Sequence, residues 1–278
     1  MTSEFHPSSK SILLFVLITF AFTWAFWVPM ALMGQGWDAP DWVVWIMESP
    51  FNVAAFGPLV GAVAVMSMNG GLGRAGRFLW SGLTRRFRPW LLLPTLLLFP
   101  AITGVAVALG QGTDALWAPR PYFDGWLAAL GAFAMVTLNG GPLQEEFGWR
   151  GFLLPALQSR MPGIVAALIV GVIWAFWHFP LNFENAGRAP QYSQVLSILI
   201  GSIITITLVS ILIGWLYNAS GGSVLLAILM HGSLNFSTFM LFPVFENQNS
   251  LAIYTGLIFL TAIVLIIIGG PGRLGKPR

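Results

Sequence analysis

Two adjacent carboxylates, Glu145 and Glu146, lie just before Arg150 in a stretch of sequence that is otherwise almost uniformly apolar. Ionisable side chains are costly at membrane depth, where they generally mark a functional site. Polar residues also interrupt two later apolar stretches, at His178, His231 and Asn235. This small set of side chains is the starting point for a functional hypothesis.

Helical spacing decides which of these side chains share a face. Glu146 and Arg150 are four residues apart, which predicts an ion pair on one face of a helix. Glu145 is rotated by about 100° from Glu146, so we expect its carboxylate to stay available for chemistry. His231 and Asn235 are also four residues apart and are expected to project to one side of their helix.

Glu145 and His178 are expected at similar heights on neighbouring antiparallel helices. The chain turns back at Met161-Pro162, and each of the two residues lies 16 positions from this turn. At 1.5 Å per residue this is roughly 24 Å along each helix, so the two side chains could face one another. Trp174 precedes His178 by four residues, and its ring is therefore expected to pack beside the imidazole.

A carboxylate, two imidazoles and an amide suit hydrolysis in a partly hydrated cavity. Glu145 would accept a proton from water while a neighbouring imidazole orients or shares that proton. His231 and Asn235 would donate hydrogen bonds to the oxyanion that forms on an attacked carbonyl. Glu145 with the histidines His178 and His231 is equally a plausible zinc ligand set with an open fourth position. The spacing leaves both roles open.

Each feature also has a structural explanation. A buried Glu146–Arg150 pair can simply join helices, and we expect Arg150 to be structural. A single histidine in an apolar helix is usually a hydrogen-bonding partner of a neighbouring helix. The occurrence of all these features at compatible depths favours a site.

The composition predicts an all-α polytopic membrane protein. Of its 278 residues, 56% are hydrophobic and 8% are charged, against about 25% charged residues in soluble domains. We therefore expect a single integral membrane domain over residues 1–278. The absence of cysteine excludes disulfides, thiolate metal sites and a cysteine nucleophile. Because the basic residues cluster beside predicted spans, they indicate anionic membrane lipids as partners and argue against nucleic acid.

Apolar runs predict about eight transmembrane helices, since about 20 apolar residues cross the hydrocarbon core. The fourth run is broken at residues 139–142 and resumes through residue 160. The helices are expected at residues 11–34, 51–68, 90–109, 125–138, 163–179, 195–217, 223–242 and 251–269.

The distribution of basic residues predicts the orientation. All 13 lysines and arginines except Arg120 and Arg188 fall on one side of this arrangement. The positive-inside rule therefore places both termini in the cytoplasm of a multi-pass protein. Arginines alternate with aromatic residues over residues 74–88, which predicts an interfacial amphipathic segment. An ordinary solvated basic loop is the alternative for this segment.

The polar residues form three motifs on separate spans, namely Glu145-Glu146-x-x-x-Arg150, Trp174-x-x-x-His178 and His231-x-x-x-Asn235. In this order they resemble the CAAX prenyl protease 2 and Abi (CPBP) family of intramembrane endopeptidases. The resemblance covers residues 138–242, so the fourth to seventh helices would form the peptidase core. The second motif of the family usually begins with Phe, whereas this chain has Trp174.

The resemblance implies a peptidase of a bacterial-type cell membrane. In that family's mechanism, Glu145 and His178 would activate water, and His231 and Asn235 would stabilise the oxyanion. Glu146 with Arg150 would support the first motif.

The cofactor and the substrate are less constrained. We favour a metal-free, glutamate-dependent enzyme, with zinc held by Glu145, His178 and His231 as the alternative. The substrate would be a membrane-associated protein or peptide, and the resemblance does not require it to be prenylated. Two other functions stay open: a catalytically silent bacteriocin-immunity or scaffold protein, and a proton-coupled transporter.

Overall fold

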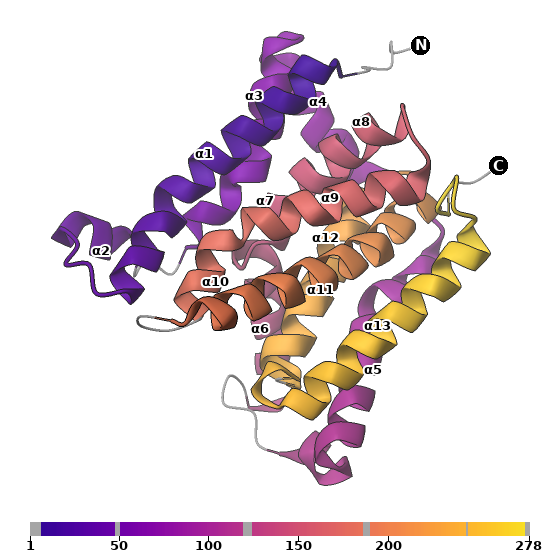
Figure 1. Ribbon diagram of the computed structural model, residues 1–278. Helices are drawn as coiled ribbons and strands as arrows, with labels where there is room; N and C mark the ends of the chain where they lie inside the picture. The colour runs from indigo at the N-terminus through magenta and orange to yellow at the C-terminus, as the bar shows by residue number, and fades with distance from the viewer. Residues whose placement is uncertain (1–6, 48–50, 119–123, 186–189, 243, 276–278) are drawn as a thin grey trace. The chain divides into compact units, whose positions relative to one another are not determined.

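The computed structural model describes the chain as a set of helices (Figure 1). Every regular element that it contains is helical, which confirms the predicted all-α class. The residues that the structure describes are 7–47, 51–118, 124–185, 190–242 and 244–275.

The predicted apolar runs are all helical, and the protein is a multi-pass integral membrane protein. Six helical stretches in the described residues are long and apolar enough to cross a membrane, and two apolar helices, Val53–Met68 and Gly163–Trp177, are shorter. The helices that correspond to the predicted runs are α1 (Ser9–Gly34), α3 (Gly57–Met68), α5 (Leu92–Gln111), α6 (Gly125–Asn139), α9 (Gly163–Trp177), α11 (Tyr192–Ala219), α12 (Val224–Asn235) and α13 (Gln248–Gly269).

Shorter elements connect or extend these helices. Two of them are π-helices, η4 and η5, and each continues directly from an α-helix. The short elements are α2 (Asp41–Met47), η1 (Val53–Phe56), α4 (Gly71–Thr84), η2 (Pro89–Leu91), η3 (Thr113–Trp117), α7 (Pro142–Glu146), η4 (Phe147–Leu153), α8 (Leu154–Gln158), α10 (Phe179–Asn185), η5 (Phe236–Leu241) and η6 (Val244–Glu246).

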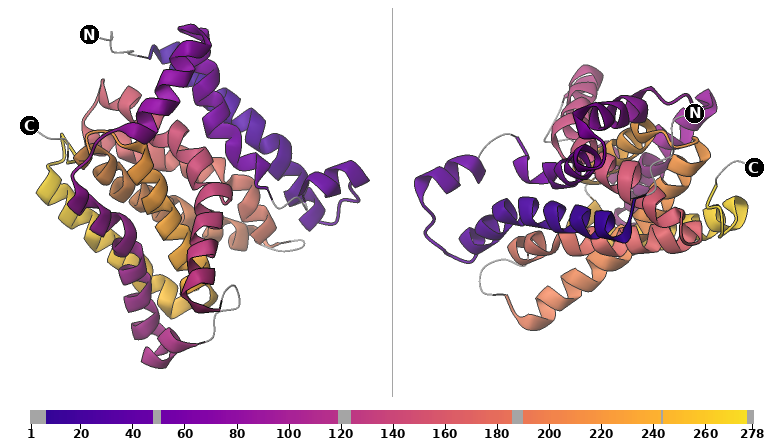
Figure 2. Two further views of the ribbon diagram at one scale, coloured as in Figure 1. Left: turned by 180° about the vertical axis from the view of Figure 1, so that it is seen from behind. Right: turned by 90° about the horizontal axis from the view of Figure 1, so that it is seen from above.

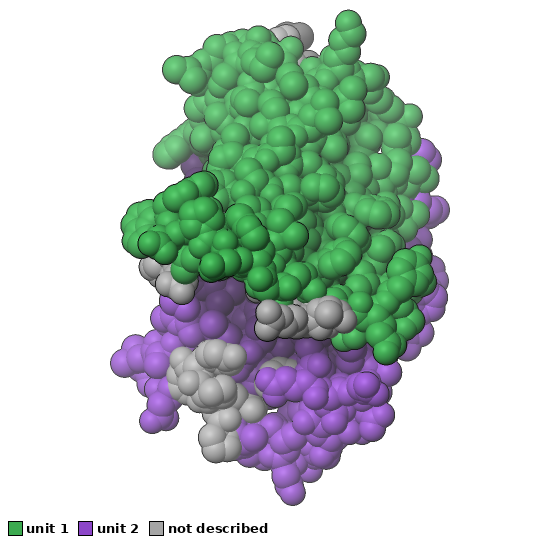
Figure 3. Space-filling view, turned by 60° about the vertical axis from the view of Figure 1, so that its left-hand side comes forward, with its two compact units in different colours: residues 1–80, 144–161, 165–210 green, residues 81–143, 162–164, 211–278 purple. Residues whose placement is uncertain are grey.

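The chain divides into two compact units, which Figure 3 distinguishes by colour. Each unit is assembled from segments that are distant in the sequence. Unit 1 contains residues 1–80, 144–161 and 165–210, and unit 2 contains residues 81–143, 162–164 and 211–278. The prediction of one integral membrane domain stays a prediction.

In unit 1, close contact between α1 and α3 depends on small residues. A Cβ added at Gly57 would lie 2.1 Å from Oγ1 of Thr23, and one added at Gly61 would lie 2.5 Å from Oγ1 of Thr19. The Thr23 hydroxyl also donates to the carbonyl of Ala54 at 2.7 Å. Small residues let helix backbones approach closely where no hydrophobic driving force operates between them.

Helix α9 is held against α11 within unit 1 (Figures 1 and 2). Ser210 Oγ donates to the carbonyl of Ala167 at 2.9 Å. Gly171 permits the close approach, because a Cβ there would lie 2.6 Å from Cα of Thr207. This contact fixes the helix that carries the second motif.

In unit 2, α12 packs against both α5 and α6. A Cβ at Gly232 would lie 2.2 Å from Oγ1 of Thr137 in α6. Ser233 Oγ donates to the carbonyl of Leu96 in α5 at 2.9 Å. The third motif therefore lies on a helix that is tightly held on two sides.

The predicted interfacial segment begins with a helix, α4. Its inner side is buried at Ala75, and Phe78 contacts the ring of Phe147 at 5.9 Å between centroids. Its outer side exposes Leu72 (81%) and Trp80 (71%). An amphipathic helix with exposed apolar and basic residues is the form expected of a segment at the membrane surface.

Gly148→Ala tests the packing between η4 and α3. The new Cβ would lie 2.4 Å from Cβ of Pro58 and 2.6 Å from its carbonyl oxygen. Because this overpacks the contact, we expect unfolding to become easier by about 1–3 kcal/mol, measured by thermal melting in detergent. Gly76→Ala is the matched control, because its Cβ would meet nothing within 4 Å. Equal melting of the two variants would contradict the contact.

Candidate active site

The first motif begins at a break in the fourth apolar helix, as the sequence predicts. Helix α6 ends at Asn139 and α7 begins at Pro142. Gly141 lies at the break with φ of 119°, a conformation that favours glycine. Pro142 suits the first turn of the renewed helix, since that position needs no N–H donor. The break places Glu145 in the first turn of a new helix, of which Glu146 is the last residue.

Glu146 and Arg150 form the predicted ion pair. Arg150 Nη1 lies 2.7 Å from Glu146 Oε1, and both side chains are fully buried. The Arg150 guanidinium also lies over the ring of Trp174, 4.7 Å from the ring centroid. The pair therefore joins the first motif to the helix of the second motif, which supports the structural role expected for Arg150.

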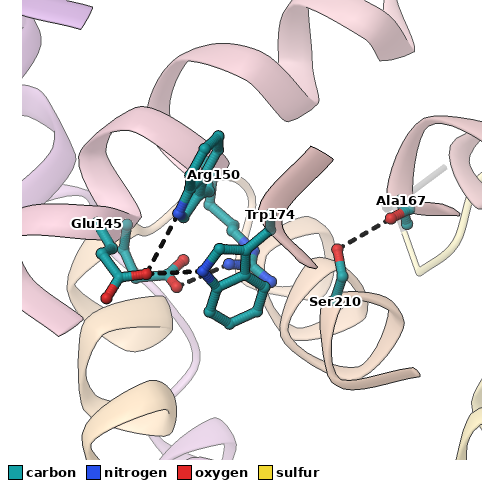
Figure 4. Close-up of polar contacts among 7 residues, drawn as sticks. Glu145, Arg150, Ala167, Trp174 and Ser210 are labelled. Atoms are coloured by element: carbon teal, nitrogen blue, oxygen red, sulfur yellow. Dashed lines mark hydrogen bonds and ion pairs between the residues drawn. The ribbon is translucent and has the colours of Figure 1, made fainter. Parts of the chain in front are cut away.

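Glu145 is held by two tryptophans. The residue is buried, with an exposed fraction of 5%. Its Oε2 accepts hydrogen bonds from Trp174 Nε1 at 2.7 Å and from Trp149 Nε1 at 3.3 Å (Figure 4). The sequence analysis did not predict these two contacts, and the availability of this carboxylate for chemistry stays a prediction. Trp149 is four residues after Glu145 and therefore lies on the same side of the helix, where its indole reaches the carboxylate.

Trp174 also connects Glu145 to His178. Its main-chain carbonyl lies 3.0 Å from Nδ1 of His178. A carbonyl oxygen only accepts, so Nδ1 carries the hydrogen, and in a neutral imidazole Nε2 then carries the lone pair. The ring centroids of Trp174 and His178 are 5.9 Å apart, which confirms the predicted packing. One residue thus contacts the carboxylate with its side chain and the imidazole with its backbone.

His178 lies in a turn, whereas the sequence places it inside the fifth helix. Helix α9 ends at Trp177, and α10 begins at Phe179. The turn is still closed by His178 N–H, which donates to the carbonyls of Trp174 at 3.3 Å and Ala175 at 3.2 Å. The imidazole is therefore at the end of α9, where the backbone changes direction.

Aromatic rings surround the imidazole of His178. Trp27 stacks on it with centroids 5.5 Å apart and planes at 25°, and Trp177 meets it edge-on at 4.6 Å. Trp24 Nε1 donates to the carbonyl of Trp177 at 3.0 Å. Sequence reasoning missed these contributions of α1. The spacing of Trp24 and Trp27, three residues apart on one helix, was the signal in the sequence for these contacts.

The third motif lies in unit 2. His231 is buried, and Asn235 is the last residue of α12. Their spacing of four residues on one α-helix agrees with the expected common face. The proximity of this pair to Glu145 stays a prediction.

A π-helix is associated with the first and third motifs. η4 begins after Glu146 and contains Arg150, and η5 begins after Asn235. A π turn widens the helix and re-aims the side chains on it, and such turns are often found at functional sites. The sequence carried no signal that distinguishes these turns from ordinary helix.

The alternative role of Glu145, His178 and His231 is to hold a zinc ion. In the part of the chain that the structure describes, no group of three or more His, Asp or Glu side chains is arranged to hold a metal ion. The Glu145 carboxylate is instead contacted by N–H donors.

Fold and site together define a polytopic membrane protein with a buried carboxylate linked to a histidine. Residues 125–237 match the family model described as "Type II CAAX prenyl endopeptidase Rce1-like". This match confirms the resemblance that the three motifs carry, and it includes all seven named residues of those motifs.

Two curated relatives are similar to the same part of the chain. CAAX prenyl protease 2 of Methanococcus maripaludis is 32% identical over 124 residues, which are 44% of this chain and 45% of the relative. Lysostaphin resistance protein A of Staphylococcus haemolyticus is 26% identical over 129 residues, which are 44% of this chain and 32% of the relative. The similarity thus spans less than half of each relative.

Arg150→Met tests the supporting role of the ion pair. It leaves the Glu146 carboxylate buried without its cation, so we expect a loss of about 3–5 kcal/mol in the free energy of unfolding. The double variant Glu146→Leu with Arg150→Met removes both charges and should recover most of the loss. Thermal melting in detergent measures both effects. Arg77→Met, on the exposed side of α4, is the control; a loss no larger than in this control would contradict the role.

Proposed function

We propose that this protein is an intramembrane endopeptidase that hydrolyses peptide bonds of membrane-associated proteins or peptides. The observation that carries the proposal is the linked arrangement of Glu145, Trp174 and His178, in which a buried carboxylate and an imidazole are held by one residue. The match of residues 125–237 to the type II CAAX prenyl endopeptidase family supports the reaction class.

In the proposed reaction, Glu145 and His178 remove a proton from a water molecule. The water oxygen attacks the carbonyl carbon of the peptide bond and forms a tetrahedral intermediate. The C–N bond then breaks, and the proton passes to the leaving nitrogen, so that the products are a carboxylate and an amine. The lone pair on Nε2 of His178 suits this proton transfer, because Nδ1 is directed to the Trp174 carbonyl.

The oxyanion of the intermediate requires hydrogen-bond donors. We assign this role to His231 and Asn235 because their motif matches that of the family and because they share one face of α12. Preorganised donors of this kind stabilise the charge that develops in the transition state.

We propose that the substrate is the lipid-anchored C-terminus of a protein or peptide. One relative is named CAAX prenyl protease 2, and a prenylated peptide would enter such a site from the bilayer. A pair of fluorogenic peptides, with and without a farnesyl group on a cysteine three residues before the end, distinguishes this class from unlipidated substrates. Faster cleavage of the farnesylated form is the expected result.

A catalytically silent resistance or immunity protein is the second candidate. It is favoured by the name of the other relative, Lysostaphin resistance protein A. Such a protein would protect cells equally well with an altered Glu145, whereas a peptidase would not.

Glu145→Gln tests the proposed mechanism. The amide keeps the shape of the side chain but is a far weaker base, so we expect cleavage of the peptide in proteoliposomes to fall by about 10²–10⁴-fold. Glu246→Gln, at an exposed position, is the matched control and should be fully active. Peptidase activity that survives in Glu145→Gln would refute the role of Glu145 as base.

Metal removal tests the choice of a metal-free mechanism. Two indole N–H groups donate to Oε2 of Glu145, and we therefore propose that this carboxylate is not a metal ligand. Dialysis against EDTA and then 1,10-phenanthroline should leave peptide cleavage unchanged, while a zinc peptidase treated in parallel loses activity. A loss that added zinc restores would show instead that a metal takes part.

A further inference from the structure

The Glu145 carboxylate receives two indole N–H donors on one oxygen. Trp174 Nε1 reaches Oε2 at 2.7 Å from α9, and Trp149 Nε1 reaches the same atom at 3.3 Å from η4 (Figure 4). All three side chains are buried. Because the donors come from two different helices, they fix both the position and the rotation of the carboxylate.

The two indoles are themselves held in place. The ring of Trp174 packs against the Arg150 guanidinium and also contacts the imidazole ring of His178. Trp149 contacts Phe15 and Trp177 edge-on, with centroids 5.8 Å and 5.7 Å apart. A donor that is locked by its own neighbours costs little further ordering when it binds the carboxylate.

The chemistry of the donors suits a base. An indole N–H only donates, and its hydrogen bond to a charged carboxylate is stronger than one to a neutral acid. The two bonds to Oε2 therefore favour one orientation of the carboxylate.

We propose that Trp149 and Trp174 are positioning residues that hold the Glu145 carboxylate in one orientation, and that Trp174 aligns it with His178. This inference rests on the proposed peptidase function. It assigns a role to Trp149, which occupies an unspecified position of the first motif. It also gives a meaning to the tryptophan at position 174, because the phenylalanine usual in the family has no N–H to donate.

Phenylalanine substitutions test the proposal, because they remove the N–H but keep an aromatic ring. In Trp174→Phe and Trp149→Phe we expect kcat for the farnesylated peptide to fall about tenfold, with KM nearly unchanged. The fall in kcat is expected because one N–H donor to Oε2 of Glu145 is lost in each variant. Trp117→Phe, at an exposed position, is the control.

A second measurement does not depend on activity. Infrared spectroscopy follows the carboxyl band of Glu145, which is identified by its absence in Glu145→Gln. The wavenumber of this band should change in Trp174→Phe and in Trp149→Phe, because each variant removes one N–H donor to Oε2. Each variant serves as the test should the other fail to fold.

The outcomes separate the two proposals. Lower melting temperatures with an unchanged kcat and an unchanged infrared band would overturn the positioning role and leave a structural one. Full activity in Glu145→Gln would refute the peptidase mechanism instead. An infrared band that shifts as expected in a protein without peptidase activity would retain the contact with Glu145 but remove its catalytic meaning.

Discussion

The burial of two neighbouring carboxylates in an apolar helix bundle is the constraint on which unit 1 depends. Each charge must be compensated inside the protein, because the surrounding bilayer offers no water to do so. Glu146 forms the ion pair with Arg150, and Glu145 accepts hydrogen bonds from two indole N–H groups. Arg150 also interacts electrostatically with Glu145. The ion pair suits Glu146 to a structural role, and we assign the chemistry to Glu145.

The packing of unit 1 follows from the need to hold these groups still. Gly171 lets α9 approach α11 closely enough for the Ser210 hydrogen bond. Helix α1 supplies Trp27, which stacks on the imidazole of His178. Trp174 then transmits this order to the carboxylate, since its carbonyl contacts His178 and its indole contacts Glu145. The proposed base and its partner are therefore positioned by the same residue.

The sequence predicted the features that depend on periodicity alone. The apolar runs, the break before Pro142 and the i,i+4 pair of Glu146 and Arg150 all follow from helix geometry and polarity. The indole donors were missed because 13 tryptophans occur in this chain, and most positions of a membrane protein suit tryptophan as an apolar or interfacial residue. The turn at His178 and the two π-helices depend on tertiary packing, for which local sequence offers no sign.

Direct attack of water, with Glu145 as a base that is not itself attached to the substrate, is the central claim of this account. A single turnover of the farnesylated peptide in H₂¹⁸O tests it most directly, with mass spectrometry of both the product and the protein. The account predicts one ¹⁸O atom in the new carboxylate of the product and none in Glu145. An unlabelled product, or ¹⁸O in the Glu145 side chain, would show a covalent intermediate on that carboxylate and would contradict the claim.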